Sequence, residues 1–216
     1  STSGLIGHAS ARSSDDTDWC YAMRFSTCQD YGEAGESAIA AWFRRKGYCV
    51  LPVYEKIIDN GKGPRLFVSE GSIIAPDLLI FGQGKAMWIE AKHKTAFSWH
   101  RMTGQWVTGI DLRHYEDYCR VEDETPWPVW LLFLHDGGQA KDSPPESPSG
   151  LFGNRLCRLR KTEHHRHRNW GSSGMVYWGV DALRFLAPLE EMATGQSSRE
   201  PDTASLPGAW TVTGRV

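Results

Sequence analysis

Two short apolar runs separated by a tight turn constrain the fold of this chain more than any other feature. The runs cover residues 73–81 and 86–92, and both are rich in the aliphatic and aromatic side chains typical of strands. Residues 82–85 between them supply the glycines that a short hairpin turn requires. We therefore predict an antiparallel hairpin centred on Gln83-Gly84.

This hairpin brings charged residues together. Positions equidistant from its centre lie opposite each other, which pairs Asp77 with Glu90. Directly paired residues share one face of a sheet with their Cβ atoms about 5 Å apart, and like charges placed that way repel. Because strand side chains alternate between faces, Lys92 projects from the same face as Glu90. The pairing therefore predicts a cluster of two carboxylates and one ammonium group.

The chemistry of this cluster suits a hard divalent cation. Mg²⁺ and Mn²⁺ prefer oxygen ligands, and Mg²⁺ usually keeps several waters and binds substrate phosphates, so a phosphodiester substrate fits. The alternative is that Asp77 and Glu90 are solvent-facing strand ends with Lys92 as their ion-pair partner. The apolar residues around each acid argue against it, because a buried charge is costly without a compensating ion.

Periodicity elsewhere predicts an α/β domain with the order helix, strands, helix, strand. Ile39 and Phe43 share a face of the first helix, and Gly47 suits its C-terminal cap. The predicted elements are a helix over 32–47, strands over 48–54, 66–68, 73–81 and 86–92, a helix from an Asp111 cap to before Pro126, and a strand over 129–134. Pro52 places the first strand at an edge or a bulge, and the continuously apolar last strand is typical of one covered on both faces.

Additions and loose ends surround this core. The remaining expectations are a turn at 59–61, loops over 93–110 and 137–150, strands over 151–161 and 175–178, and a short helix from an Asp181 cap to Leu186. We expect a flexible segment over 1–18, one domain over 19–193 with its core at about 32–136 and a basic, His-rich addition at 150–190, and a flexible tail over 194–216.

Composition excludes several classes of protein. A net charge of -2 and a pI near 6.4 argue against a protein that coats nucleic acid by bulk attraction. Five cysteines without framework spacing predict reduced thiols. No apolar run approaches the roughly 20 residues of a membrane span, and the first 18 residues lack the blocks of a secretion signal. We expect a soluble, cytoplasmic protein with no membrane contact.

Pro76-Asp77, the thirteen-position step to Glu90, one intervening residue and Lys92 resemble the motif of the PD-(D/E)XK nucleases. This restriction-endonuclease-like superfamily includes Holliday-junction resolvases. The resemblance covers about half of the chain and implies an α/β fold with an αβββαβ core, a central mixed sheet flanked by helices. Segments such as 127–135 also resemble uncharacterised phage and prophage proteins, which would place a phage-encoded protein in the host cytoplasm.

The resemblance implies a mechanism for phosphodiester hydrolysis. In it, Asp77, Glu90 and the carbonyl of Ala91 bind Mg²⁺, with Mn²⁺ as a substitute. Lys92 would orient the attacking water or help to deprotonate it.

Family members often add a carboxylate from the first helix. Glu36 is the better match here and Glu33 is the second choice, although either side chain could simply complement the helix dipole. Related nucleases also carry polar or aromatic residues on the helix after the lysine, a place that Gln105, Tyr115 and Tyr118 could fill. For the two tyrosines, a place in the core is the simpler interpretation.

Nucleic-acid contacts are predicted at two places. Lys94 and Arg101 lie just beyond the predicted catalytic strand, although a solvated loop would look the same. A dense positive patch contains Arg155, Cys157, Arg158, Arg160, Lys161, His164, His165, Arg166, His167 and Arg168. Arg158, Arg160 and Lys161 are its candidates for DNA contact. A zinc site at the cysteine and histidines stays open despite poor agreement with finger spacing, as does a plain solvated loop.

These features together predict a metal-dependent endonuclease that hydrolyses DNA, with a junction-directed or structure-directed enzyme as one form of it. The rival is a catalytically silent nucleic-acid-binding or structural protein with the same fold, since fold alone does not establish activity. The intact set of Asp77, Glu90 and Lys92 favours the enzyme, because a retired site would be free to lose a member. RNA as substrate stays open, and so does a homodimer, because many relatives cut both strands as dimers.

Overall fold

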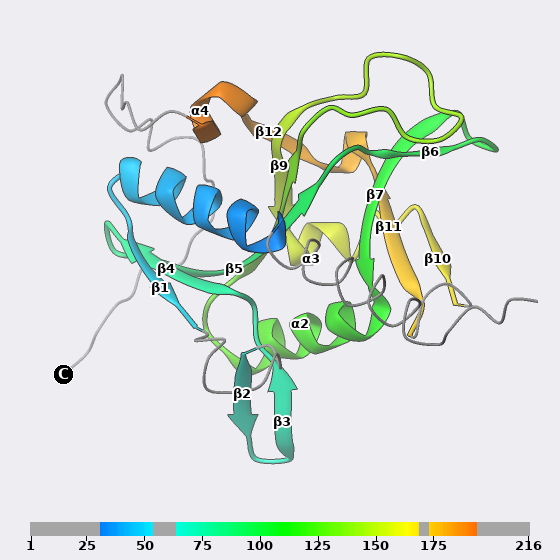
Figure 1. The fold of residues 1–216 in the computed structure, drawn as a ribbon. Coiled ribbons are helices and arrows are strands. Elements are labelled where there is room, and N and C mark those ends of the chain that lie inside the picture. The colour runs from blue at the N-terminus through cyan, green and yellow to red at the C-terminus, as the bar shows by residue number, and fades with distance from the viewer. Residues whose placement is uncertain (1–30, 54–63, 169–172, 194–216) are drawn as a thin grey trace, which may run out of the picture.

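The computed structural model describes residues 31–53, 64–168 and 173–193 (Figure 1). The predicted flexible segments over 1–18 and 194–216 and the predicted turn at 59–61 lie outside the described residues. A helix covers residues 31–45, close to the predicted range.

A six-stranded mixed sheet forms the centre of the fold. Its order is β1-β4-β5-β8-β9-β12, with β5 and β8 parallel and every other neighbouring pair antiparallel. The strands are β1 (Cys49–Pro52), β4 (Leu78–Gly82), β5 (Lys85–Lys94), β8 (Val129–His135), β9 (Gly150–Arg155) and β12 (Arg184–Ala187). The helix over 31–45 covers one face and α2 (Leu112–Glu124) the other (Figure 1). The chain order helix, β1, β4, β5, α2, β8 confirms the predicted αβββαβ core.

The hairpin of β4 and β5 has the predicted register. Leu78 lies opposite Ile89, and the two turn residues both have positive φ. One of them is Gln83, at φ 53°, a conformation that costs a residue with a side chain more than it costs glycine. One position beyond the last strand pair, Asp77 comes opposite Glu90, as the symmetry of the turn predicts.

Apolar side chains cover both faces of β5 and β8. Ile39 and Phe43 of the first helix pack with Ala91 on one face, and Tyr118 and Val121 of α2 belong to the cluster on the other face. Every residue of β8 is buried, which explains why the sequence there is apolar throughout. The helix α2 supplies the crossover that parallel pairing of β5 with β8 requires.

The predicted single strand over 73–81 is wrong, because the chain forms two strands there. The first of them pairs in a separate hairpin that projects from the body of the protein (Figure 1). The hairpin strands are β2 (Arg65–Val68) and β3 (Gly71–Ile74). Pro76 lies in the break and has no N–H to donate to a ladder. The Ile74 N–H donates to Asp117 Oδ2 of α2 at 3.1 Å, and Asp77 is left at the entrance to β4.

A second sheet of four antiparallel strands stands beside the main sheet (Figure 1). Its order is β10-β11-β7-β6. The strands are β6 (Ser98–His100), β7 (Gln105–Asp111), β10 (His165–His167) and β11 (Met175–Gly179). β6 and β7 occupy the predicted loop over 93–110, so that expectation is wrong. Their short length and mixture of Trp, His and polar residues obscure the alternation that marks a strand.

Other local expectations are also corrected. The predicted strand over 151–161 ends at Arg155, and α3 (Leu156–Leu159) follows it. The predicted helix over 181–186 is a 3₁₀ turn (Val180–Ala182) followed by β12, because pairing with β9 overrides the local preference. After β12, α4 covers Leu189–Ala193. Asp111 precedes α2, but its side chain forms no capping hydrogen bond.

Two expectations from composition concern cysteines and membranes. The three cysteines in the described part of the chain, Cys49, Cys119 and Cys157, are free thiols. Cys20 and Cys28 lie outside that part. None of the helices in the described ranges has both the length and the apolar character needed to cross a bilayer.

The tight contact between β8 and β9 yields a testable prediction. A Cβ atom on Gly153 would lie 2.6 Å from the backbone oxygen of Leu131 and 2.4 Å from Leu132 Cδ2. Gly153→Ala should therefore lower the free energy of unfolding by about 1–3 kcal/mol. Gly32→Ala is the matched control, because that position is helical with nothing within 4 Å, and it should be neutral or stabilising by up to about 1 kcal/mol. Urea unfolding measures both values, and equal effects would contradict the packing.

Candidate metal and catalytic site

The β4–β5 hairpin holds two carboxylates next to each other. Glu90 lies in the middle of β5 and is 0% exposed. Asp77 stands at the entrance to β4, and its Oδ2 accepts a hydrogen bond from the Ala91 N–H at 3.0 Å. Two residues along β5 from Glu90, Lys92 turns to the same face and forms an ion pair with Glu90 Oε1. The structure therefore brings the three predicted side chains together at one place.

The negative charge of Glu90 is only partly offset by the groups around it. Both of its carboxylate oxygens are buried and accept no hydrogen bond of ordinary geometry within the described residues, and the neighbouring groups that carry protons are the Tyr118 hydroxyl and the Lys92 ammonium group. A buried carboxylate that lacks donors is costly unless a cation stands beside it. The ammonium group of Lys92 supplies one positive charge for two carboxylates. The charge balance of the pocket therefore favours an additional cation.

The ionisation of Asp77 reflects the same imbalance. Burial raises the pKa of this carboxyl from 3.8 to about 7, and the neighbouring charge of Glu90 adds to the increase. The charge of Lys92 and the hydrogen bond from the Ala91 N–H oppose the shift without cancelling it. At neutral pH the site therefore holds Asp77 close to its midpoint of protonation.

The pKa of Lys92 is also raised, but for this group the increase favours the charged form. Burial by itself would lower the pKa of its ammonium group, but the negative charges of Glu90 and Asp77 outweigh burial and raise it. Glu36 on the first helix contributes to the increase, which places its carboxylate within electrostatic range of Lys92. Lys92 therefore remains a cation and can donate hydrogen bonds within the pocket.

The first-helix carboxylate does not complete a metal-binding group with the other two acids. Within residues 31–53, 64–168 and 173–193, no three His, Cys, Asp or Glu side chains are arranged to hold an ion. The assignment of Glu36 as a metal ligand stays a prediction, and its carboxylate is close enough to Lys92 to raise the pKa of that ammonium group. Two carboxylates still fit Mg²⁺, because this ion is usually held by one or two carboxylates, waters and substrate phosphates. The carboxylate oxygens of Asp77 and of the poorly compensated Glu90 match that requirement.

Helix α2 closes the other side of the pocket with Tyr118, one of the candidates from the sequence, and with His114, which the sequence analysis did not assign to the site. Tyr118 is buried, and burial together with the charges of Glu90 and Asp77 raises the pKa of its hydroxyl. The pKa of His114 is lowered by burial and by the positive charge of Lys92. Their spacing of four residues puts both rings on one helix face, and that pattern was the available signal.

Gln105 and Tyr115 do not reach this pocket in the way the resemblance implies. Gln105 begins strand β7 instead of lying on the helix after the lysine, and it is exposed. Tyr115 is a core residue, as the simpler interpretation predicted, and its hydroxyl donates to Glu163. Of the three candidates, Tyr118 alone faces the two carboxylates.

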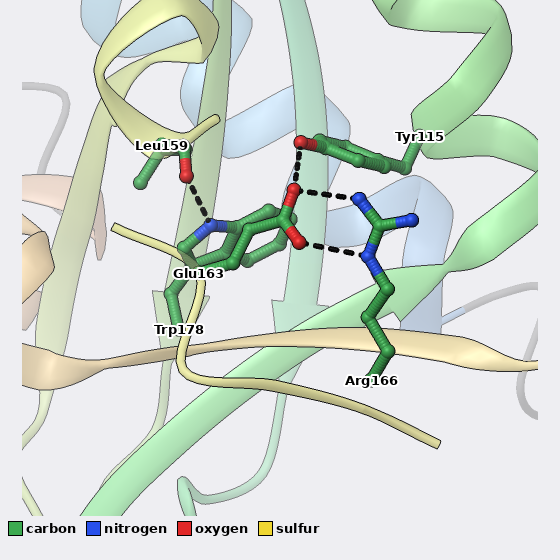
Figure 2. A network of polar contacts seen from close by, with 5 residues as sticks. All are labelled: Tyr115, Leu159, Glu163, Arg166 and Trp178. Carbon is green, nitrogen blue, oxygen red and sulfur yellow. Dashed lines mark hydrogen bonds and ion pairs between the residues drawn. The ribbon is translucent and has the colours of Figure 1, made fainter. Parts of the chain in front are cut away.

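The basic stretch is partly neutralised by its own surroundings. Glu163 accepts two hydrogen bonds from the Arg166 guanidinium, at 2.7 and 2.9 Å, as well as the bond from Tyr115 (Figure 2). Beside this network, Trp178 Nε1 donates to the carbonyl of Leu159 at 2.9 Å (Figure 2). Arg166 therefore belongs to a structural network that joins α2 to the segment before β10.

The five predicted DNA-contacting cations differ in their surroundings. Arg160 pairs with Asp123 at 3.1 Å, and Arg101 pairs with Asp142. Lys94 is half-buried, and burial followed by the charge of Lys92 lowers its pKa to about 8. Arg158 and Lys161 are exposed and form no ion pair within the described residues. These last two are the cations best placed to meet phosphate.

The zinc alternative gains no support from the described part of the chain. Cys157 is a free thiol in α3, whereas His164 and His165 lie at the edge of the second sheet, with their Nδ1 atoms 2.7 Å apart. The ring of His100 joins these two at 4.6–4.9 Å between centroids. Hydrogen bonds to Thr103 occupy His164 and His100.

Comparison with known proteins provides only distant similarity. No family model and no curated protein matches the sequence. The chain is similar in structure to a Holliday junction resolvase of Archaeoglobus fulgidus, with a TM-score of 0.43 and 10% identity over 76% of this chain and 100% of that one. It is also similar to a nuclease from a fusselovirus, with a TM-score of 0.33 and 12% identity over 69% of this chain and 78% of the other.

The raised pKa of Asp77 predicts a pH-dependent difference in stability. Because the folded protein holds a proton at Asp77 that the unfolded chain releases, this group lowers the free energy of unfolding as pH rises from about 4 to about 7. Asp77→Asn has no carboxyl group at this position, so its free energy of unfolding does not fall for this reason as pH rises. Relative to the wild type, its free energy of unfolding should rise across this window by more than about 1 kcal/mol and then level off, since one unit of pKa corresponds to about 1.4 kcal/mol.

Chemical unfolding in the presence of EDTA at a series of pH values measures this difference. A stability difference that stays constant between pH 4 and pH 8 would show that Asp77 titrates normally. Asp181→Asn is the matched control, because Asp181 is exposed and its replacement should give such a constant difference.

Proposed function

We propose that this protein is a metal-dependent endonuclease that hydrolyses phosphodiester bonds in DNA. One observation carries the proposal: Glu90 is fully buried beside the carboxyl group of Asp77 and the ammonium group of Lys92, so two acids share one cation inside the protein. A protein that used these residues only for stability would gain more from apolar side chains at the centre of a covered sheet. The arrangement is therefore better explained by chemistry than by folding.

The two carboxylates would hold Mg²⁺, or Mn²⁺ in its place. When bound, the ion supplies positive charge for the phosphate oxygens and lowers the pKa of a water molecule. Asp77 is already oriented next to Glu90 for this role, because the Ala91 N–H holds its Oδ2 at 3.0 Å. The predicted ligand role of the Ala91 carbonyl belongs to the same proposal.

Lys92 would act on the substrate side of the pocket. Its ammonium group is anchored by Glu90 and stays protonated at neutral pH, so it can donate hydrogen bonds to the attacking water or to a phosphate oxygen. The side chain is 34% exposed, whereas Glu90 is sealed from solvent, so the lysine marks the open end of the site. A cation at this position stabilises the charge that develops on the phosphate in the transition state.

DNA would be bound through local positive groups. Arg158 and Lys161 offer exposed charges on and just after α3, and Lys94 continues the face of β5 that carries Lys92. We include junction-directed or structure-directed cleavage in the proposal, on the strength of the sequence resemblance described above. A homodimer and a cytoplasmic location remain predictions from the sequence.

Replacement of the central residues tests the proposed chemistry. Asp77→Asn and Lys92→Ala should each lower the rate of Mg²⁺-dependent DNA cleavage by at least about 100-fold, because each removes a group that acts on the reacting phosphate or its water. The rate is measured on supercoiled, linear, single-stranded and four-way-junction DNA, with RNA of the same sequence alongside. Cleavage of RNA without cleavage of any DNA would show that the substrate is RNA and not DNA.

In the absence of metal, Lys92→Ala and Asp77→Asn should differ in their free energy of unfolding. Lys92→Ala leaves Glu90 buried without its cation and should be less stable than wild type, whereas Asp77→Asn removes repulsion and should not be. Lys85→Ala, on the same strand but next to the turn, is the control that should keep full cleavage. Wild-type rates for Asp77→Asn at equal Mg²⁺ would exclude Asp77 as a ligand and remove the main support for the proposal.

The exposed cations of α3 make a separate prediction about binding. In the Asp77→Asn background without metal, replacement of Arg158 and Lys161 by Ala should weaken DNA binding for every sequence. It should also reduce the slope of log affinity against log salt by about 1–2, because each phosphate contact releases counterions. Arg44→Ala removes an exposed charge from the first helix as a control. An unchanged salt slope for the double variant would show that Arg158 and Lys161 do not contact phosphate.

A further inference from the structure

One strand of the central sheet carries functional side chains on one face and an anchor for the first helix on the other. Lys92 faces α2, and the next residue, His93, faces the helix over 31–45, because side chains alternate along β5. The His93 ring stacks on the ring of Tyr31 with centroids 3.8 Å apart and an interplanar angle of 7°. The imidazole is largely buried, with a side-chain exposure of 12%.

Hydrogen bonds complete the anchor. His93 Nδ1 lies 3.0 Å from the carbonyl oxygen of Tyr31, and Nε2 lies 2.8 Å from Asp136 Oδ1. The hydroxyl of Tyr31 donates to the other oxygen of the same carboxylate. Asp136 is itself fixed to β5, because its N–H donates to the carbonyl of Lys94 at 3.1 Å. The first turn of the helix is thus tied to the ends of both central strands.

Gly35 shows how closely the helix sits on this anchor. A Cβ atom at Gly35 would lie 2.2 Å from His93 Cβ and 2.7 Å from Cγ, so only glycine allows the helix backbone to rest on the imidazole. The following residue is Glu36, whose carboxylate is within electrostatic range of Lys92. The residue that sets the height of the helix over β5 is therefore next to the one that faces the catalytic lysine.

We propose that His93 is a positioning residue, which holds the first turn of the helix through Tyr31, Asp136 and Gly35 and thereby places Glu36 beside the Asp77–Glu90–Lys92 site. Glu36 then contributes its charge to a bound divalent ion, directly or through a coordinated water. This inference rests on the proposed metal-dependent function of that site. It assigns His93 no contact with substrate.

A double-mutant cycle on metal binding tests the inference, because coupled residues give non-additive effects. The probe is Mn²⁺ alone, titrated into wild type, His93→Ala, Glu36→Gln and the double variant. We expect each single replacement to raise the apparent Kd for Mn²⁺ by about 10-fold, the scale of losses caused by residues that orient ligands, and the double variant to match Glu36→Gln. Wild-type affinity for His93→Ala, or a loss of about 100-fold for the double variant, would overturn the inference.

Two further variants separate positioning from stability. Val176→Ala loses core packing in the second sheet, far along the chain from the helix, and should bind Mn²⁺ like wild type at a comparable loss of stability. An equal loss of affinity in that variant would overturn the positioning role. Tyr31→Phe removes only the bond to Asp136, and it replaces His93→Ala in the cycle if that variant does not fold; a smaller, still non-additive loss is then expected.

Cleavage of supercoiled DNA, measured on the same proteins, distinguishes this inference from the proposed function. A wild type that cleaves, with additive effects of His93 and Glu36 on Mn²⁺ binding, overturns the positioning role alone. A wild type that binds Mn²⁺ with the expected coupling but cleaves no DNA overturns the nuclease proposal alone. A wild type that neither binds Mn²⁺ nor cleaves overturns both.

Discussion

The repulsion between Asp77 and Glu90 is the constraint on which the functional interpretation of this protein depends. The register of one hairpin sets the two acids opposite each other, and burial removes Glu90 from solvent and leaves Asp77 half-buried. Lys92 offsets part of the repulsion, but the pKa of Asp77 still rises to about 7. A pocket with this charge balance accepts a cation more readily than water-exposed acids would, because fewer waters compete for the carboxylate oxygens.

The rest of the main sheet keeps that pocket in place. β5 carries the site residues and pairs with a strand on each side, β4 and β8, while helices cover both faces. A slip of one residue in the hairpin would turn Glu90 and Lys92 to the opposite face, so packing on both sides defines the register strongly. The stability of the core and the geometry of the site therefore have the same origin.

Charged residues of the basic stretch beside the second sheet form structural contacts with the rest of the protein. Glu163 joins Arg166 to Tyr115 of α2, and Arg160 pairs with Asp123 of the same helix. These contacts attach the C-terminal part of the chain to the helix that closes the site. They also leave few cations without an ion-pair partner in the described part of the stretch, which is why Arg158 and Lys161 stand out among residues that look equivalent in the sequence.

The sequence by itself determined the hairpin, its register and the order helix, strands, helix, strand, because a period of two, a Gly-rich turn and a continuously apolar strand are local patterns. Tertiary structure alone decided where the chain departs from those patterns. The end of β3 before Pro76, the strand β7, and the pairing of β12 with β9 depend on partners distant in the chain, which are Asp117, β11 and β9. The same holds for the approach of Tyr118 and His114 to the site, since a helix pattern shows which residues share a face but not what that face meets.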